Sequence, residues 1–258
     1  MRLTFLGTGT SKGVPEIGCT CPVCRSTDGR DKRLRVSALV ETGGTRILID
    51  CGPDFREQML GIPSKPIDGV LLTHEHYDHT GGIDDLRPFC RFGDIEVFAD
   101  ELTCTHLRER LPYFFREVLY PGVPVLHFHT MAPYRPVCIK GVEVMPLQVM
   151  HGKMPILGFR IGGLGYITDM TDAPEETMRQ LAGVDTLVIG ALRHKPHATH
   201  QTIERAAEVA RSLGARETYL IHMNHEAGLH AETDAQLPEH VHLAYDGLAI
   251  EVADPAHP

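Results

Sequence analysis

The 258-residue sequence has no long hydrophobic run. No apolar stretch approaches the roughly 20 residues that a membrane-spanning helix needs, so we expect no membrane span. Residues 1–7 contain one basic residue and a short apolar run, and they lack the longer hydrophobic region of a secretory signal. These two absences predict a cytoplasmic protein.

The sequence also lacks an excess of positive charge. Acidic residues outnumber basic residues by 34 to 25, which gives a net charge of −9 with histidine neutral. A sequence-independent grip on nucleic acid needs clustered Lys and Arg to neutralise phosphates. The charge balance therefore disfavours a nucleic-acid substrate without excluding one.

The cysteines do not form a disulfide framework. Their number, seven, is odd, and four of them have no regular spacing: Cys51, Cys90, Cys104 and Cys138. Reduced thiols in a cytosol explain these four better than a set of disulfides. The other three cysteines lie close together near the N-terminus.

Apolar segments with β character recur along the chain, whereas helical patterns are fewer. The segments with β character are 3–6, 36–40, 47–49, 70–72, 95–98, 142–149, 157–161, 186–189, 218–221 and 248–252. The clearest helices are 175–181 and 202–213, of which the second ends at Gly214. This alternation predicts an α/β fold with helices on the outer faces of sheets. The length and even composition predict one domain, 1–258.

A long segment at 112–136 is rich in Pro, Tyr and Phe. We interpret it as a long connection that serves as a lid. Its aromatic residues are equally suited to a contact in a homodimer, and both interpretations stay open. These residues are Tyr113, Phe114, Phe115 and Tyr120.

A histidine-rich turn follows the apolar segment 70–72 and reads THEHYDHTGG. His74 and His76 are two residues apart and point the same way if strand geometry continues, whereas Asp78 and His79 can face a neighbouring point. Imidazole and carboxylate are ligands for Zn, Mn or Fe. Burying this group without a metal would be costly because each polar atom needs a partner. The motif therefore predicts two metal ions.

The turn resembles the HxHxDH signature of the metallo-β-lactamase superfamily. That resemblance implies the αβ/βα four-layer sandwich and three further ligands at strand ends, His151, Asp169 and His222. By resemblance, one metal would be held by His74, His76 and His151. The other would be held by Asp78, His79 and His222. Asp169 would bridge the two, and Zn or Mn, with Fe as a third candidate, would occupy them.

A second cluster, C-x-C-x₂-C, lies within about residues 18–25 and contains Cys19, Cys21 and Cys24. Closely spaced thiolates on a Gly/Pro loop form a chelate, and a structural zinc needs four ligands. His225, three residues after His222, is the natural fourth ligand. The loop is therefore predicted to hold one structural Zn.

This combination resembles the PhnP-like phosphodiesterases, which carry a structural zinc near the active site and act on phosphoribosyl 1,2-cyclic phosphate. The opening segment 6–15, LGTGTSKGVP, matches them as well. The resemblance implies a metal-dependent phosphodiesterase that hydrolyses a small cyclic phosphate ester. Asp78 would orient the nucleophile, and His200 would hold the phosphate or protonate the leaving oxygen.

Additional phosphate on a substrate would need cationic partners. The candidates are Arg193, His194, Lys195 and His197, which a solvated loop explains equally well.

Rival functions share the metal core. A tRNA 3′-processing endonuclease would carry an RNA-gripping arm, but only a hairpin-sized stretch separates His151 from Asp169. A glyoxalase-type thioesterase stays open, whereas a β-lactamase is less favoured because a bridging Asp169 is typical of the phosphodiesterase and thioesterase branches. A PqqB-like carrier protein without turnover shares the Cys-rich opening, so the zinc loop alone does not define the substrate.

Overall fold

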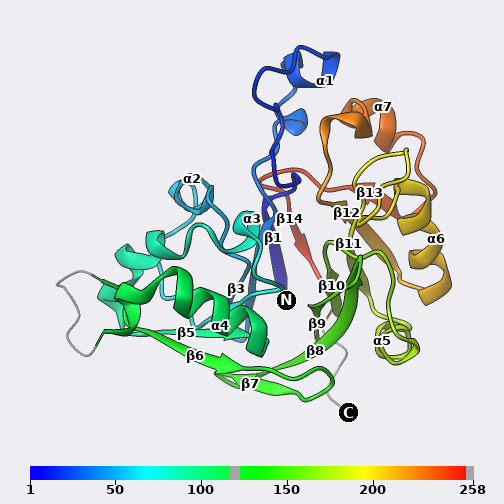
Figure 1. Ribbon diagram of the computed structural model, residues 1–258. Coiled ribbons are helices and arrows are strands. Elements are labelled where there is room, and N and C mark those ends of the chain that lie inside the picture. Colours follow the sequence, from blue (N-terminus) through cyan, green and yellow to red (C-terminus); the bar gives the residue numbers. More distant parts are fainter. Residues whose placement is uncertain (117–122, 254–258) are drawn as a thin grey trace.

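A computed structural model describes residues 1–116 and 123–253, in which two seven-stranded sheets lie face to face (Figure 1). The first sheet contains, in spatial order, β14 (Ala249–Glu251), β1 (Arg2–Gly7), β2 (Ser37–Thr42), β3 (Thr45–Ile49), β4 (Gly69–Leu71), β5 (Ile95–Ala99) and β6 (Leu126–Thr130). The second contains β13 (Val241–Leu243), β12 (Glu217–Ile221), β11 (Thr186–Gly190), β10 (Leu164–Ile167), β9 (Met154–Ile161), β8 (Val142–His151) and β7 (Val137–Ile139).

Helices cover the outer face of each sheet. The first sheet packs against α2 (Phe55–Leu60), α4 (Glu101–Arg110) and the 3-10 helix Ile83–Phe92. The second packs against α5 (Glu175–Leu181) and α6 (Ile203–Leu213). Shorter helices are α1 (Pro22–Arg25), α3 (Tyr77–Thr80), α7 (His230–Asp234) and the 3-10 helices Gly29–Asp31, Pro112–Phe115 and His225–Ala227. None of the helices in the described ranges is long and apolar enough to cross a bilayer.

The two sheets share one hydrophobic core. Phe5 and Ile49 from the first sheet meet Phe159 and Tyr166 from the second, and all four are at most 1% exposed. Each large apolar side chain buried in this way contributes about 1.5–3 kcal/mol. With helices outside both sheets, this core confirms the predicted αβ/βα four-layer sandwich.

Helix α6 illustrates how local sequence sets an element. The Thr202 side chain accepts a hydrogen bond from the backbone N–H of Arg205 and caps the first turn. Ile203, Ala206, Val209, Ala210 and Leu213 recur at helical spacing and are buried against the second sheet. Gly214, at φ 67°, ends the helix in the left-handed conformation that glycine adopts without strain.

The expectation for segment 112–136 was wrong in part. Residues 126–130 form β6, the edge strand of the first sheet, which pairs with β5 in parallel. Phe114 is 5% exposed and packs against the first sheet's outer core, so its ring is part of that core. Phe115 is 37% exposed, and Tyr120 lies outside the described residues.

The predicted site residues follow strands of both sheets. The segment with His74 to His79 comes after β4, and His151 is the last residue of β8. Asp169 and His222 come shortly after β10 and β12. Because the sheets face each other, these strand ends meet at one edge of the sandwich.

Candidate functional site

A glycine holds the histidine-rich loop close to the first sheet. A Cβ on Gly52, just after β3, would lie 2.1 Å from the backbone oxygen of Asp78. No side chain fits at that distance, so the chain can approach the loop only because residue 52 is glycine. The packing places Asp78 and His79 beneath the end of β3.

The first group of metal-binding atoms comes from His74, His76 and His151, which offer ligand atoms within 4.8 Å of one another. His74 Nε2 lies 2.9 Å from His76 Nδ1. His151 Nδ1 lies 2.9 Å from the backbone oxygens of both Asp169 and Thr199. Those carbonyls accept from the ring N–H at Nδ1, which leaves Nε2 of His151 as the ligand atom.

The second group comprises Asp78, His79 and His222. Asp78 Oδ2 lies 3.3 Å from His79 Nε2 and 3.5 Å from His222 Nε2. In the described part of the chain, His79 Nε2 and both ring nitrogens of His222 are buried without a hydrogen-bond partner. Leaving such atoms unpaired costs about 1–3 kcal/mol each, and a divalent cation would satisfy them. The set therefore fits a metal ion.

Asp169 lies between the two groups. Its Oδ1 is 3.5 Å from His79 Nε2 and 3.2 Å from His222 Nε2, and it accepts a 2.6 Å hydrogen bond from Thr168. Asp169 also forms a ligand group with His74 and His79. Although burial opposes ionisation, His222 and His79 hold the pKa of this carboxyl well below its usual range. An ionised carboxylate in this place can bridge two cations.

Three buried site residues adopt left-handed backbone conformations. Asp50, Asp169 and His222 have φ values of 59°, 51° and 61°. Such a conformation costs a non-glycine residue about 1–3 kcal/mol, and it persists where the surrounding structure enforces it. All three lie just after a strand, at the edge of the sandwich where the strand ends meet.

Asp50 is a site residue that the sequence analysis missed. Its Oδ2 lies 2.7 Å from His79 Nδ1, and its Oδ1 accepts from the backbone N–H of Thr73. The carboxylate fixes the ring so that Nε2 of His79 faces the metal site. The signal was present, because Asp50 directly follows the fully buried strand β3, where an acid needs a partner.

Asp50→Asn is expected to weaken binding of Mn²⁺ by about 10–100-fold, because loss of a carboxylate that orients a metal-binding histidine has effects of that size. Calorimetric titration of the metal-free protein measures the affinity. Asp94→Asn, which alters a surface carboxylate paired with His127, is the matched control. Unchanged affinity in Asp50→Asn would contradict the orienting role.

His200 borders the metal-binding groups. Its ring stacks on His222 at 4.9 Å and 21°, and its Nδ1 lies 3.8 Å from Asp169 Oδ2. Burial, followed by the nearby His222, lowers the pKa of His200 to about 3. Its position allows contact with a phosphoryl group bound beside Asp169.

A polar pocket of about 220 Å³ opens beside His200. Lys12 there pairs with Glu16 at 2.9 Å, and Arg193 pairs with Glu226. The volume is below the roughly 300–1,000 Å³ of pockets for drug-sized ligands, so the pocket suits a small substrate group. His197 and Arg193 of the proposed phosphate-binding loop line it.

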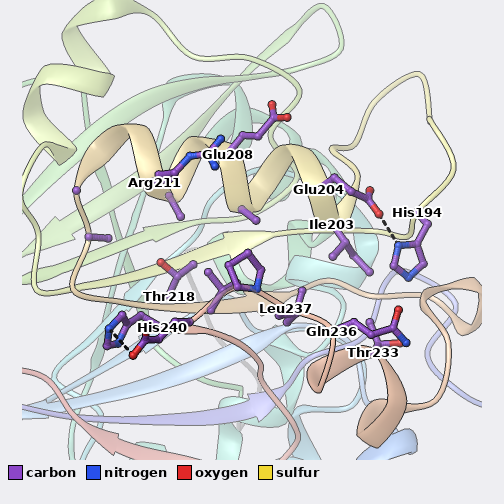
Figure 2. Close-up of a pocket in the computed structure, with 17 residues that line it drawn as sticks. His194, Ile203, Glu204, Glu208, Arg211, Thr218, Thr233, Gln236, Leu237 and His240 are labelled. Carbon is purple, nitrogen blue, oxygen red and sulfur yellow. Dashed lines mark hydrogen bonds and ion pairs between the residues drawn. The ribbon is translucent and has the colours of Figure 1, made fainter.

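A larger groove, about 660 Å³, lies between α6 and residues 236–241 (Figure 2). His194 lines this groove and pairs with Glu204 at 2.6 Å, so it does not serve the small pocket. None of the predicted metal ligands borders the groove. The smaller pocket differs from the groove because it is lined by His200, whose ring stacks on the metal-binding residue His222.

The thiolate cluster gathers around His225. Its Nδ1 lies 3.2 Å from Cys19 Sγ and 3.3 Å from Cys21 Sγ, and Cys24 belongs to the same group. The backbone N–H of Cys24, together with His225, lowers the pKa of Cys21 to about 6. His225 Nε2 faces Glu16 at 3.4 Å. Three sulfurs and one imidazole nitrogen fit a tetrahedral zinc.

Comparison with known proteins agrees with this architecture. The family model for the beta-lactamase superfamily domain matches residues 45–223. A crystal structure of a diphosphatase from the PhnP family is 41% identical, with a TM-score of 0.90 and 97% of each chain covered. Zn²⁺-bound PqqB from Methylobacterium extorquens shares the fold at 21% identity and a TM-score of 0.78, covering 98% of this chain and 100% of that one.

A curated relative, an octanoyltransferase from Porphyromonas gingivalis, is 48% identical over 250 residues. The match covers 96% of this chain and 51% of the relative, so the chain spans about half the length of that protein. Taken with the PhnP-family structure, the family match shows that this chain belongs to the metallo-β-lactamase superfamily, within its PhnP-like branch.

Proposed function

We propose that this protein is a metal-dependent hydrolase that cleaves a small phosphodiester of the cyclic ribose phosphate type. The observation that carries the proposal is the position of Asp169, whose carboxylate lies within 3.5 Å of ring nitrogens of His79 and His222. It also lies 3.8 Å from His200, which lines the small polar pocket. Two divalent cations, Zn or Mn with Fe as a third candidate, would lower the pKa of water and polarise a phosphoryl oxygen. The pocket would receive the leaving group.

The protein's own residues have separate roles in this proposal. Asp78 orients the attacking water, and Asp50 keeps His79 in its ligand geometry. His200 contacts the phosphoryl group or the leaving oxygen. The thiolate cluster would hold a structural Zn close to the pocket. His225 belongs to the cluster and also lines the pocket, as does its partner Glu16.

A second candidate is hydrolysis of a diphosphate, which the 41% identity to a PhnP-family diphosphatase favours. It would use the same centre, since both reactions break a bond between phosphorus and oxygen. RNA processing is less well supported. Strands β9 and β10 occupy most of the chain between His151 and Asp169, which leaves no RNA-gripping arm there.

A substrate panel tests the proposal on the metal-loaded protein. It contains bis(p-nitrophenyl) phosphate, ribose 1,2-cyclic phosphate with and without a 5-phosphate, a nucleoside diphosphate sugar, S-lactoylglutathione, an octanoyl thioester and nitrocefin. We expect turnover of the phosphodiesters. Turnover of the diphosphate alone supports the second candidate, and turnover of thioesters alone rejects both. If the protein turns over none of these substrates, the result favours a PqqB-like carrier protein without turnover.

His200→Ala distinguishes the two roles of that residue. If His200 protonates the leaving oxygen, the variant should hydrolyse cyclic ribose phosphate about 10²-fold more slowly than the wild type. Hydrolysis of an aryl ester should be affected far less, because p-nitrophenolate leaves without a proton. A role in holding phosphate predicts similar losses on both substrates. Rates are compared at matched metal occupancy, with His194→Ala as the control outside the pocket. If the variant loses no activity on either substrate, His200 has no role in the reaction.

A further inference from the structure

The metal-binding loop has little structure of its own. Its ligands His76, Asp78 and His79 lie in or next to α3, which is a single turn. A helix this short leaves its last carbonyl groups without partners inside the helix. The position of the ligands therefore depends on contacts from other elements.

Arg110, the last residue of α4, makes such contacts at both ends of the loop. Its Nη2 donates to Thr80 Oγ1 at 2.7 Å and to the Thr80 backbone oxygen at 3.3 Å, whereas Nη1 donates to the Glu75 backbone oxygen at 3.4 Å. The Thr80 hydroxyl in turn donates to the backbone oxygen of His76 at 2.9 Å. One guanidinium thus links Glu75 to Thr80, the two ends of the loop, and restricts the loop to one conformation.

The charge of Arg110 also suits this place. A cation at the carboxyl end of a helix is favoured by the helix dipole, and α3 ends at Thr80. The guanidinium lies 6.0 Å over the ring of Tyr77, which packs on Gly81 so closely that a Cβ there would approach the ring within 2.8 Å. Among the ion pairs of the described residues, none involves Arg110.

Arg110 is an exposed residue, yet burial of its guanidinium lowers its pKa, so the charged group is partly shielded from water. His106, one turn earlier on α4, contacts the Glu75 carboxylate. The same face of α4 therefore holds the loop through two side chains. Arg108, on a different face, lies instead over the rings of Phe115 and Phe128.

We propose that Arg110 is a positioning residue for the metal centre, which acts by fixing the loop that carries His76, Asp78 and His79. The inference rests on the proposed metal-dependent function and adds a residue that touches neither metal nor substrate. Small displacements of ligands lower metal affinity. Removing a group that supports the ligands typically lowers the affinity by about 10–100-fold. Arg110 would contribute an effect of that size.

Binding of Mn²⁺ to the metal-free protein tests the proposal, because Mn²⁺ prefers His and carboxylate ligands over the thiolate cluster. Arg110→Met is expected to weaken Mn²⁺ binding by about 10–100-fold, while Arg108→Met on the same helix stays within about twofold of wild type. At saturating Mn²⁺, kcat and KM of Arg110→Met should return close to wild type. A merely structural role would lower Tm and leave the affinity unchanged.

Two milder variants keep the test decisive if Arg110→Met does not fold. Arg110→Lys retains the charge but not the paired donors, and Thr80→Val removes the hydroxyl between Arg110 and His76. Both should weaken Mn²⁺ binding, whereas Thr80→Ser should not. Wild-type affinity in Arg110→Met, or in both milder variants, overturns the proposal. Since binding is measured without substrate, failure of the phosphodiesterase function would show separately as a wild-type protein that binds Mn²⁺ without turnover.

Discussion

Replacing Asp169 by asparagine is expected to lower kcat of the metal-loaded protein on bis(p-nitrophenyl) phosphate by about 10³-fold. Asparagine keeps the shape and can keep the hydrogen bond from Thr168, but it removes the negative charge between His79 and His222. Both groups of metal-binding residues share that charge. Several kcal/mol of transition-state stabilisation depend on the pair of cations that it would bridge.

The control for this variant is Asp172→Asn, three residues further along the chain. Asp172 belongs to no metal-binding group in the described residues, and its backbone oxygen accepts from Met150 whichever side chain is present. Circular dichroism should show the same fold in both variants. If Asp169→Asn retains turnover near the wild-type value with both metals present, the bridging assignment is wrong.

Cys21→Ser is expected to abolish tight zinc retention in the N-terminal loop. After mild chelation the wild-type protein should keep about one Zn per chain, because a closed four-ligand thiolate site releases metal more slowly than an open catalytic one. The variant should keep almost none, since a serine hydroxyl is a poor substitute for a thiolate beside His225. Elemental analysis of the dialysed protein measures the difference.

Loss of this zinc should also loosen the loop. The local apolar cluster contains only Val14, Val23 and Cys24 as buried members, which is too small to hold the segment without a metal. Limited proteolysis should therefore cut Cys21→Ser near α1, which projects beyond the two sheets (Figure 1). Cys138→Ser, at an exposed cysteine, is the control. Equal zinc content in Cys21→Ser and wild type would show that the site is wrongly drawn.

Local patterns in the sequence predicted much of the fold. The segment 47–49 became β3, and 175–181 became α5, because burial of apolar side chains and helix spacing act over a few residues. Segment 126–130 was missed, although Leu126, His127 and Phe128 alternate between apolar and polar. An edge strand buries one face only, so its signal is weaker than that of a buried strand.

The sequence alone predicted the candidate ligands that lie close to one another along the chain. The spacing of His74, His76, Asp78 and His79 fixes their geometry within one strand end and one helical turn, and the same holds for the three clustered cysteines. His225 was predicted as the fourth ligand of that cluster, and the structure brings it beside Cys19 from 206 residues away.

Only the tertiary structure decided how those atoms are completed and supported. Asp50 reaches His79 from 29 residues away, and Arg110 reaches Thr80 from 30. Arg193, which the sequence shows only as a free cation, is paired with the carboxylate of Glu226 at the pocket, 33 residues away. Such contacts depend on which strand ends and helix faces meet when two sheets pack, and no local spacing encodes that meeting because side chains far apart in sequence become neighbours only through the shared core.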